Sequence, residues 1–567
     1  MHGAPMRMGR TQASHKPWQA HLHQPAACTG SLASMVTTRS ISHMGSFAAH
    51  APHSVNPQYD SDSHEGPIIT EYTPASAPSP TSSAPTTYTP VSSQQLQQLA
   101  QGADVASVTS MVSLLLQQLP ARTQAHLAAM KAMTVQCQKG GHHTAAGAAA
   151  TVPGVQPPGA ADKHLSAGDI ADMWGALRDV VAAAAARKRA AMDSFVAHSR
   201  GPLGLVADCG PSSATSALDT ASDSLQLCVM EAAAALREEI ETEVMHLAGD
   251  LQRLTETPGW WTQRGLVDAV DSLMDEHVVY TLALRVLLSE AGCTWARARR
   301  AAGLKGQGLR TGAGAGSVVD AYSTAGPRHP PGHDSDATAC ASLLGANTPI
   351  VPLLRLAAED TRAFCIEKNS LAPEVVVAGD EEVGATSADA YIEYVYTEVL
   401  KNGMQALIAK WGAWDIDEAD PIQVEVAATP AVPTLTPHAK QIVHLTPPKP
   451  WAAQQQGAAG AGAHLVTSAA DASAGYVHIK ITDTGGGIGD AALSRVSHYF
   501  ATSHKARQQE GYGYSRDHGS QFQGLGVGAP LSAAYARFLG GGMAWEVPPG
   551  KGKTTVHVWL PAAGFAF

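Results

Sequence analysis

Two glycine-rich stretches decide the fold of this chain: Lys480-Ile-Thr-Asp-Thr-Gly-Gly-Gly-Ile-Gly489 and Gly524-Leu-Gly-Val-Gly-Ala-Pro530. The second runs into a predicted helix that Pro530 opens and the glycines from Gly540 end. Glycines before a helix N-terminus expose backbone N–H groups that suit phosphate oxygens. Either stretch alone is usually a turn, so the interpretation depends on what accompanies them.

The first stretch follows a predicted strand. Val477, Ile479 and Ile481 alternate with polar residues, which is the pattern of a half-buried strand. Asp483 continues the apolar positions, so we expect its carboxylate on the buried side of the strand's end. A buried carboxylate needs a hydrogen-bond donor, and an adenine amino group is a good one. The glycines that follow allow a sharp turn close to a flat ring.

A predicted helix over 394–407 supplies polar groups of another kind. One face, at i, i+4 and i+7, carries Glu398, Asn402 and Gln405. A solvated face would explain each residue alone. However, Asn is a poor helix former, and its amide oxygen is a good ligand for Mg²⁺. Glu398, one turn earlier, could take a proton from an attacking hydroxyl.

The order Glu-x-x-Lys-Asn at 398–402, Asp-x-Gly-Gly-Gly-Ile at 483–488 and Gly-x-Gly-x-Gly at 524–528 resembles the GHKL ATPase superfamily of gyrase, Hsp90, histidine kinases and MutL. Within it, the resemblance is closest to the mitochondrial protein kinases of 2-oxoacid dehydrogenases. The stretch 524–541 is similar to that family's Gly-Phe-Gly-Phe-Gly-Leu-Pro-x-Ser-Arg-Ala-Tyr-Ala-x-Tyr-Leu-Gly-Gly.

Three features favour the branched-chain 2-oxoacid dehydrogenase kinase type over pyruvate dehydrogenase kinase. Tyr394 stands where pyruvate dehydrogenase kinases usually carry His. The stretch 360–377 resembles the branched-chain pattern Asp-Ala-Arg-x-x-Cys-Glu-x-Lys-x-x-x-Ala-Pro-x-Val. The chain also ends soon after its last predicted strand, without the longer tail typical of the pyruvate type.

The resemblance implies a role for each candidate site residue. Asp483 receives the adenine amino group with Thr554 in support, Asn402 holds Mg²⁺, and Glu398 is the base for a substrate serine. Lys401 could add positive charge near the phosphates. The remaining ATP-binding positions implied are Gly485, Gly487, Thr502, Ser503, Gly524, Leu525, Gly526, Val527 and Gly528.

The expected activity is ATP-dependent phosphorylation of serine on the decarboxylase component of a mitochondrial 2-oxoacid dehydrogenase complex, which lowers that component's activity. The implied partners are this component and the lipoyl-bearing core, and the implied assembly is a homodimer. Three alternatives stay open: a pyruvate dehydrogenase kinase, a GHKL histidine kinase, and a non-catalytic ATP-binding scaffold. Departures from the family pattern at Gly403, Gln405, Thr484 and Ala533 would suit the scaffold. However, Glu398, Asn402, Asp483 and both glycine stretches persist, which favours an active enzyme.

Composition narrows the class of protein. With a net charge of −11 and only 15% charged residues, nothing points to nucleic-acid binding. The seven cysteines include no Cys-x-x-Cys, which argues against structural zinc and a disulfide framework. No apolar run approaches the roughly 20 residues that span a bilayer.

The 567 residues divide into an α+β arrangement. The stretch 1–60 has no acidic residue before Asp60, a composition typical of a mitochondrial or chloroplast transit peptide, although a disordered tail is the alternative. The family resemblance implies the mitochondrial matrix. A disordered linker is expected over 61–91 and an antiparallel helix bundle over 92–300, broken at Pro120. A low-complexity linker over 301–345 precedes a GHKL-type α/β-sandwich ATP-binding domain over 346–567, with an insertion at 429–475 expected to be a disordered surface loop.

Overall fold

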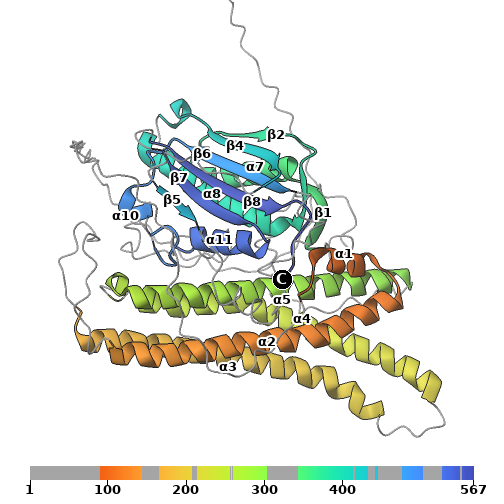
Figure 1. The fold of residues 1–567 in the computed structure, drawn as a ribbon. Helices are drawn as coiled ribbons and strands as arrows, with labels where there is room; N and C mark the ends of the chain where they lie inside the picture. Colours follow the sequence, from red (N-terminus) through yellow and green to blue (C-terminus); the bar gives the residue numbers. More distant parts are fainter. Residues whose placement is uncertain are drawn as a thin grey trace, which may run out of the picture. The chain divides into compact units, whose positions relative to one another are not determined.

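The computed structural model describes residues 90–143, 165–206, 214–255, 257, 260–302, 342–412, 415–431, 441–444, 475–493, 495–501, 526–548 and 552–567. Within these residues the protein is mixed helix and sheet, with a helical N-terminal region and an α/β C-terminal region (Figure 1). The predicted transit peptide, nearly all of the 61–91 linker, most of the 301–345 linker and most of the 429–475 insertion lie outside the described residues.

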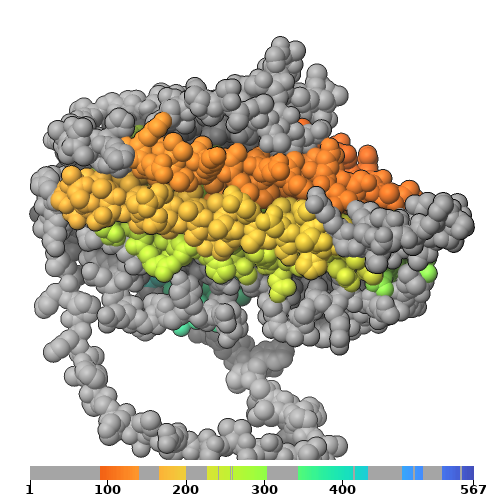
Figure 2. All heavy atoms as spheres, turned by 90° about the horizontal axis from the view of Figure 1, so that it is seen from below, coloured from red at the N-terminus to blue at the C-terminus, as the bar shows by residue number. Residues whose placement is uncertain are grey.

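Long helices build the N-terminal region. Its elements are α1 (Ser93–Gln101), α2 (Val105–His143), α3 (Ala167–Val206), α4 (Ala214–Thr255), the short η2 (Trp260–Thr262) and α5 (Arg264–Ala301). The helix α2 packs on α3 and α5, and α4 packs on the same two helices. Figure 2 shows α2 and α3 side by side along one face of this bundle.

Contacts inside the bundle show how α2 and α5 run. The Thr123 hydroxyl lies 2.9 Å from the Tyr280 hydroxyl, and the ring of His126, further along α2, approaches that of His277, earlier on α5. Residue numbers rise on one helix as they fall on the other, so these two helices are antiparallel, as the bundle prediction requires.

The predicted break at Pro120 is wrong, because Pro120 lies inside α2. Leu119 before it and Thr123 after it are both buried, and the Thr123 hydroxyl donates to the Leu119 carbonyl at 2.8 Å. Pro removes a single helical hydrogen bond, to the carbonyl of Leu116. The Leu116 side chain is 40% exposed, so water can reach this side of the helix, while the buried residues on either side of Pro120 keep α2 packed in the bundle.

A six-stranded sheet forms the core of the C-terminal region, in the order β2-β4-β6-β8-β7-β5. The strands β2 and β4 are parallel and the other pairs are antiparallel. A separate pair, β1 and β3, is antiparallel. The strands are β1 (Leu344–Pro349), β2 (Val375–Gly379), β3 (Gly384–Ala388), β4 (Ile422–Thr429), β5 (Gln441–His444), β6 (Tyr476–Asp483), β7 (Gly542–Val547) and β8 (Thr554–Pro561).

Helices cover one face of this sheet (Figure 1). They are α7 (Ile350–Asn369), α8 (Asp389–Trp411) and α11 (Gly528–Phe538), and the short elements η4 (Ile416–Glu418) and α10 (Asp490–Leu493) lie in connections. The alternate residues Val477, Ile479 and Ile481 of β6 are buried, as predicted from the two-residue period. The predicted helix at 394–407 is confirmed within α8.

The expected loop over 429–475 is incorrect in one place. The strand β5 lies inside it and pairs antiparallel with β7, from Gln441 opposite Val547 to His444 opposite Ala544. Four residues flanked by Pro-, Ala- and Gly-rich sequence carry too little periodicity to be recognised as a strand, and the partner strand β7 supplies the pairing.

No helix in the described part of the chain combines the length and the apolar character needed to cross a membrane.

Candidate functional site

Asp483 lies where the sequence predicts it, at the end of β6 with its side chain on the buried face. The residue is 9% exposed, and its neighbour across the β6–β8 pairing is Thr554. The backbone N–H of Gly485 donates to Asp483 Oδ1 at 2.8 Å. Burial raises the pKa of Asp483 to about 6, although the Gly485 N–H and the Lys410 ammonium oppose this rise. A further hydrogen-bond donor would therefore stabilise the ionised carboxylate.

The first glycine stretch turns tightly against α8. A Cβ added at Gly485 would lie 2.5 Å from the Ala406 side chain, so a side chain here would push the strand end off the helix. Gly487 is in the same turn with a positive φ of 79°, and the Gly486 N–H donates to the Gly552 carbonyl at 3.0 Å. These contacts give Gly485 a packing role in addition to the predicted approach to a ring.

The second glycine stretch is described from Gly526 onward. Gly526 has a φ of 72° and lies so close to the Ala501 carbonyl that any side chain would collide with it. Val527 is buried, and Gly528 is the first residue of α11. Four of the predicted ATP-binding residues lie outside the described residues: Thr502, Ser503, Gly524 and Leu525.

Glu398 is buried on α8 and forms an ion pair with Lys401. The Lys401 Nζ lies 2.5 Å from Glu398 Oε1, and the two side chains are each 10% exposed. The other carboxylate oxygen faces α11, because a Cβ added at Gly528 would lie 2.5 Å from Glu398 Oε2. Sequence reasoning assigned Lys401 to the phosphates, whereas in the structure its partner is Glu398.

The helix α8 brings the two glycine stretches together. Its residue Glu398 meets Gly528 of the second stretch, and its residue Gly403 faces Asp483 of the first, since a Cβ at Gly403 would lie 3.8 Å from Asp483 Oδ2. These two points on the helix are about 8 Å apart at 1.5 Å per residue. Asn402 lies between them, next to Gly403, with an exposed side chain. The candidate metal ligand and base therefore lie on one helix, and the candidate adenine ligand at the end of β6 faces the same helix.

A metal at this site would have few protein ligands. The described residues contain no group of three or more His, Cys, Asp or Glu side chains that could hold an ion. The Asn402 amide, exposed and one helical turn after Glu398, fits an ion of the Mg²⁺ type, which takes one or two protein ligands and completes its shell with water and substrate phosphates.

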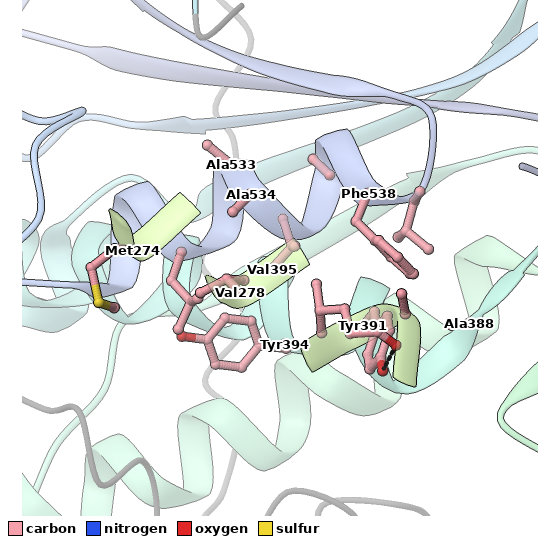
Figure 3. Close-up of a cluster of buried hydrophobic side chains, with 14 of the residues drawn as sticks. Met274, Val278, Ala388, Tyr391, Tyr394, Val395, Ala533, Ala534 and Phe538 are labelled. Carbon is pink, nitrogen blue, oxygen red and sulfur yellow. Dashed lines mark hydrogen bonds between the residues drawn. The ribbon is translucent and has the colours of Figure 1, made fainter. Parts of the chain in front are cut away.

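An apolar junction fixes α8 and α11 on the bundle helix α5 (Figure 3). Tyr394 of α8 stacks on Tyr535 of α11, with ring centroids 4.7 Å apart. Met274 and Val278 of α5 lie against the same cluster, and Phe538 closes it on the α11 side (Figure 3). Tyr394, which in the sequence favours a resemblance to the branched-chain type, thus helps to hold α8, the helix that carries Glu398.

Carboxylates of α5 hold the segment before residue 502, and sequence reasoning missed them. Asp271 accepts from the Tyr499 N–H at 2.9 Å and lies 2.5 Å from His498 Nδ1. Asp275 accepts from the Tyr499 hydroxyl at 2.8 Å and pairs with Arg537 of α11 at 2.7 Å. Two acids one turn apart on a helix usually indicate a solvated face, so the sequence offered little to identify them.

A small cavity lies between α8 and the sheet and is separate from Asp483. Its lining is Ile392, Val395, Tyr396, Ile479, Ile481, Leu539, Val558 and Leu560. The Tyr396 hydroxyl is the one polar side-chain group in this lining, so the cavity does not suit a nucleotide.

No family model matches this chain, and no curated protein matches it.

Proposed function

We propose that this protein is an Mg²⁺- and ATP-dependent protein serine kinase with a GHKL-type nucleotide site built around α8. The observation that carries the proposal is the convergence on this one helix of Asp483, Asn402, Glu398 and the start of α11. These groups are the parts that ATP-dependent phosphoryl transfer requires. They are a buried carboxylate for the base of the nucleotide, an exposed amide for the metal, a carboxylate that acts as a base, and a helix N-terminus preceded by glycines.

In this proposal each residue has a physical task. Asp483 accepts a hydrogen bond from the adenine amino group, and this donor stabilises the buried carboxylate. Backbone N–H groups at the start of α11 hold phosphate oxygens. Asn402 would ligate Mg²⁺, which neutralises charge on the phosphates when it is bound.

Glu398 acts on the acceptor. It takes the proton from the serine hydroxyl, and the serine oxygen attacks the γ-phosphorus. The bond from the γ-phosphorus to the β–γ bridging oxygen breaks, and its electron pair leaves with ADP. The products are phosphoserine, ADP and a protonated Glu398, whose proton then passes to water.

For the substrate we propose the decarboxylase component of a 2-oxoacid dehydrogenase complex, with the branched-chain complex ahead of the pyruvate complex. What supports this is the sequence resemblance at 360–377 and 524–541 together with Tyr394. Binding to the lipoyl-bearing core, a homodimeric state and a location in the mitochondrial matrix belong to the same proposal, and they rest on the resemblance and on the composition of 1–60.

The test is phosphate transfer from Mg-ATP to each isolated dehydrogenase component. Phosphoserine on the branched-chain decarboxylase is the expected result, and phosphoserine on the pyruvate decarboxylase would reassign the substrate. Phosphohistidine on the protein itself would indicate a histidine kinase, and ATP binding without any transfer would indicate a scaffold.

One variant isolates the base. We expect Glu398→Gln to bind ATP but to lose at least about a hundredfold in transfer, since general base catalysis contributes on this order. The matched control is Glu367→Gln on the exposed side of α7. Full transfer by Glu398→Gln would remove this residue from the mechanism.

A further inference from the structure

Glu398 and Lys401 form a buried ion pair whose position matters for the base. Both are on the same side of α8, one turn apart, with 2.5 Å between Lys401 Nζ and Glu398 Oε1. The Lys401 ammonium also lies 5.9 Å from the ring centroid of Phe364 on α7. Removing one partner of such a pair leaves an uncompensated buried charge, so the pair constrains both side chains.

The second oxygen of Glu398 is held from another direction. Oε2 faces Gly528, the first residue of α11. A helix N-terminus carries partial positive charge and N–H groups without helical partners. One oxygen of Glu398 therefore contacts the Lys401 ammonium, and the other faces the start of α11.

The triphosphate that the proposed function puts at the start of α11 would be attracted to that ammonium and to that helix N-terminus, because phosphate oxygens accept strongly from ammonium groups and helix N-termini. Resting on that function, we propose that Lys401 is a positioning residue that exchanges partners. It holds Glu398 in the ion pair until the phosphates of a bound nucleoside triphosphate take its ammonium. The carboxylate is then free to accept the serine proton.

The exchange predicts a specific pattern in nucleotide affinity, which calorimetry with ATP and Mg²⁺ can measure without any phosphoryl transfer. In the wild type, the phosphates must draw Lys401 away from Glu398. Glu398→Gln removes the charge of the competitor, so we expect this variant to bind ATP about tenfold more tightly, a typical coupling between interacting sites. In a Lys401→Met background the same Glu398→Gln change should give no gain.

The main rival explanation is plain repulsion between Glu398 and the triphosphate. Repulsion alone would give the same gain with or without Lys401, and a gain that survives in the Lys401→Met background would overturn the exchange. Lys401→Arg keeps the charge and should preserve the gain. Lys410 lies on the same helix as Lys401 and donates to the carbonyl of Thr484, the residue after Asp483. A Lys410→Met background should therefore also preserve the gain in ATP affinity.

Thermal melts establish that each variant is folded, and Lys401→Gln replaces Lys401→Met if the latter does not fold. Failure of the two hypotheses can be told apart. A wild-type protein that does not bind ATP refutes the proposed function and the exchange with it. A wild type that binds ATP, with equal affinity in Glu398→Gln, refutes the exchange alone.

Discussion

Replacing Asp483 with Asn should stabilise the protein and weaken nucleotide binding at the same time. The carboxylate is buried, and its pKa rises from 3.8 to about 6. Asn has nearly the same shape and no charge, and its amide oxygen can still accept from the Gly485 N–H. The substitution therefore removes the cost of burying a charge while it keeps the hydrogen bond that shapes the turn.

The magnitude follows from the pKa. A shift of about two units, at about 1.36 kcal/mol per unit, corresponds to about 3 kcal/mol. Because the folded state raises the pKa, the folded protein favours the protonated acid. There is no penalty below the unfolded pKa, and the penalty grows as the pH rises until it is complete above about pH 6. At pH 7.5 we expect Asp483→Asn to raise the free energy of unfolding by up to about 3 kcal/mol, and at pH 4 by almost nothing.

Nucleotide affinity should move in the opposite direction. A hydrogen bond to a charged acceptor contributes about 1.5–3 kcal/mol, so its weakening by Asn should cost at least about tenfold in the Kd for ATP. Urea unfolding at the two pH values and calorimetry with ATP measure the two effects. Asp420→Asn, at an exposed acid before β4, is the matched control and should change neither. Equal stability effects at both pH values, or an unchanged Kd for ATP in Asp483→Asn, would refute the reasoning.

Three further predictions use the same contacts. Gly528→Ala puts a Cβ 2.5 Å from Glu398 Oε2, so we expect phosphoryl transfer to fall at least about tenfold, and an unchanged rate would show that the carboxylate is not held there. Tyr499→Phe removes the hydroxyl that donates to Asp275 and should lower the free energy of unfolding by about 1–3 kcal/mol in urea titrations, whereas no loss would mean that the bond is dispensable. The wild-type affinity for ATP should fall about tenfold per unit as the pH drops below about 6, because Asp483 must lose its proton to accept the adenine amino group. A flat calorimetric profile from pH 7 to pH 5 would contradict this assignment.

Sequence periodicity predicted the parts of the site that lie on regular elements with one buried face. The strand β6 alternates between buried and partly exposed residues, so the parity of Asp483 was enough to predict its burial. The strand β7 was not predicted, because its residues Gly542 to Trp545 are buried on both faces and show no alternation.

Other features depend on which elements meet in space, and periodicity carries no information about that. The Glu398–Lys401 pair looks like an ordinary surface pair at i and i+3 until α7 and α11 cover it. Asp271 and Asp275 of α5 are likewise indistinguishable from solvated acids in the sequence. Their partners His498, Tyr499 and Arg537 lie more than two hundred residues away along the chain.

The contacts of α5 bear on how the candidate site is held. Through Asp271 and Asp275 this helix binds the segment that precedes residue 502, and through Asp275 it also binds Arg537 near the end of α11. The first residue of α11 is the one that faces Glu398. A continuous series of contacts therefore runs from the bundle helix α5 through α11 to Glu398, the group that we propose accepts the serine proton.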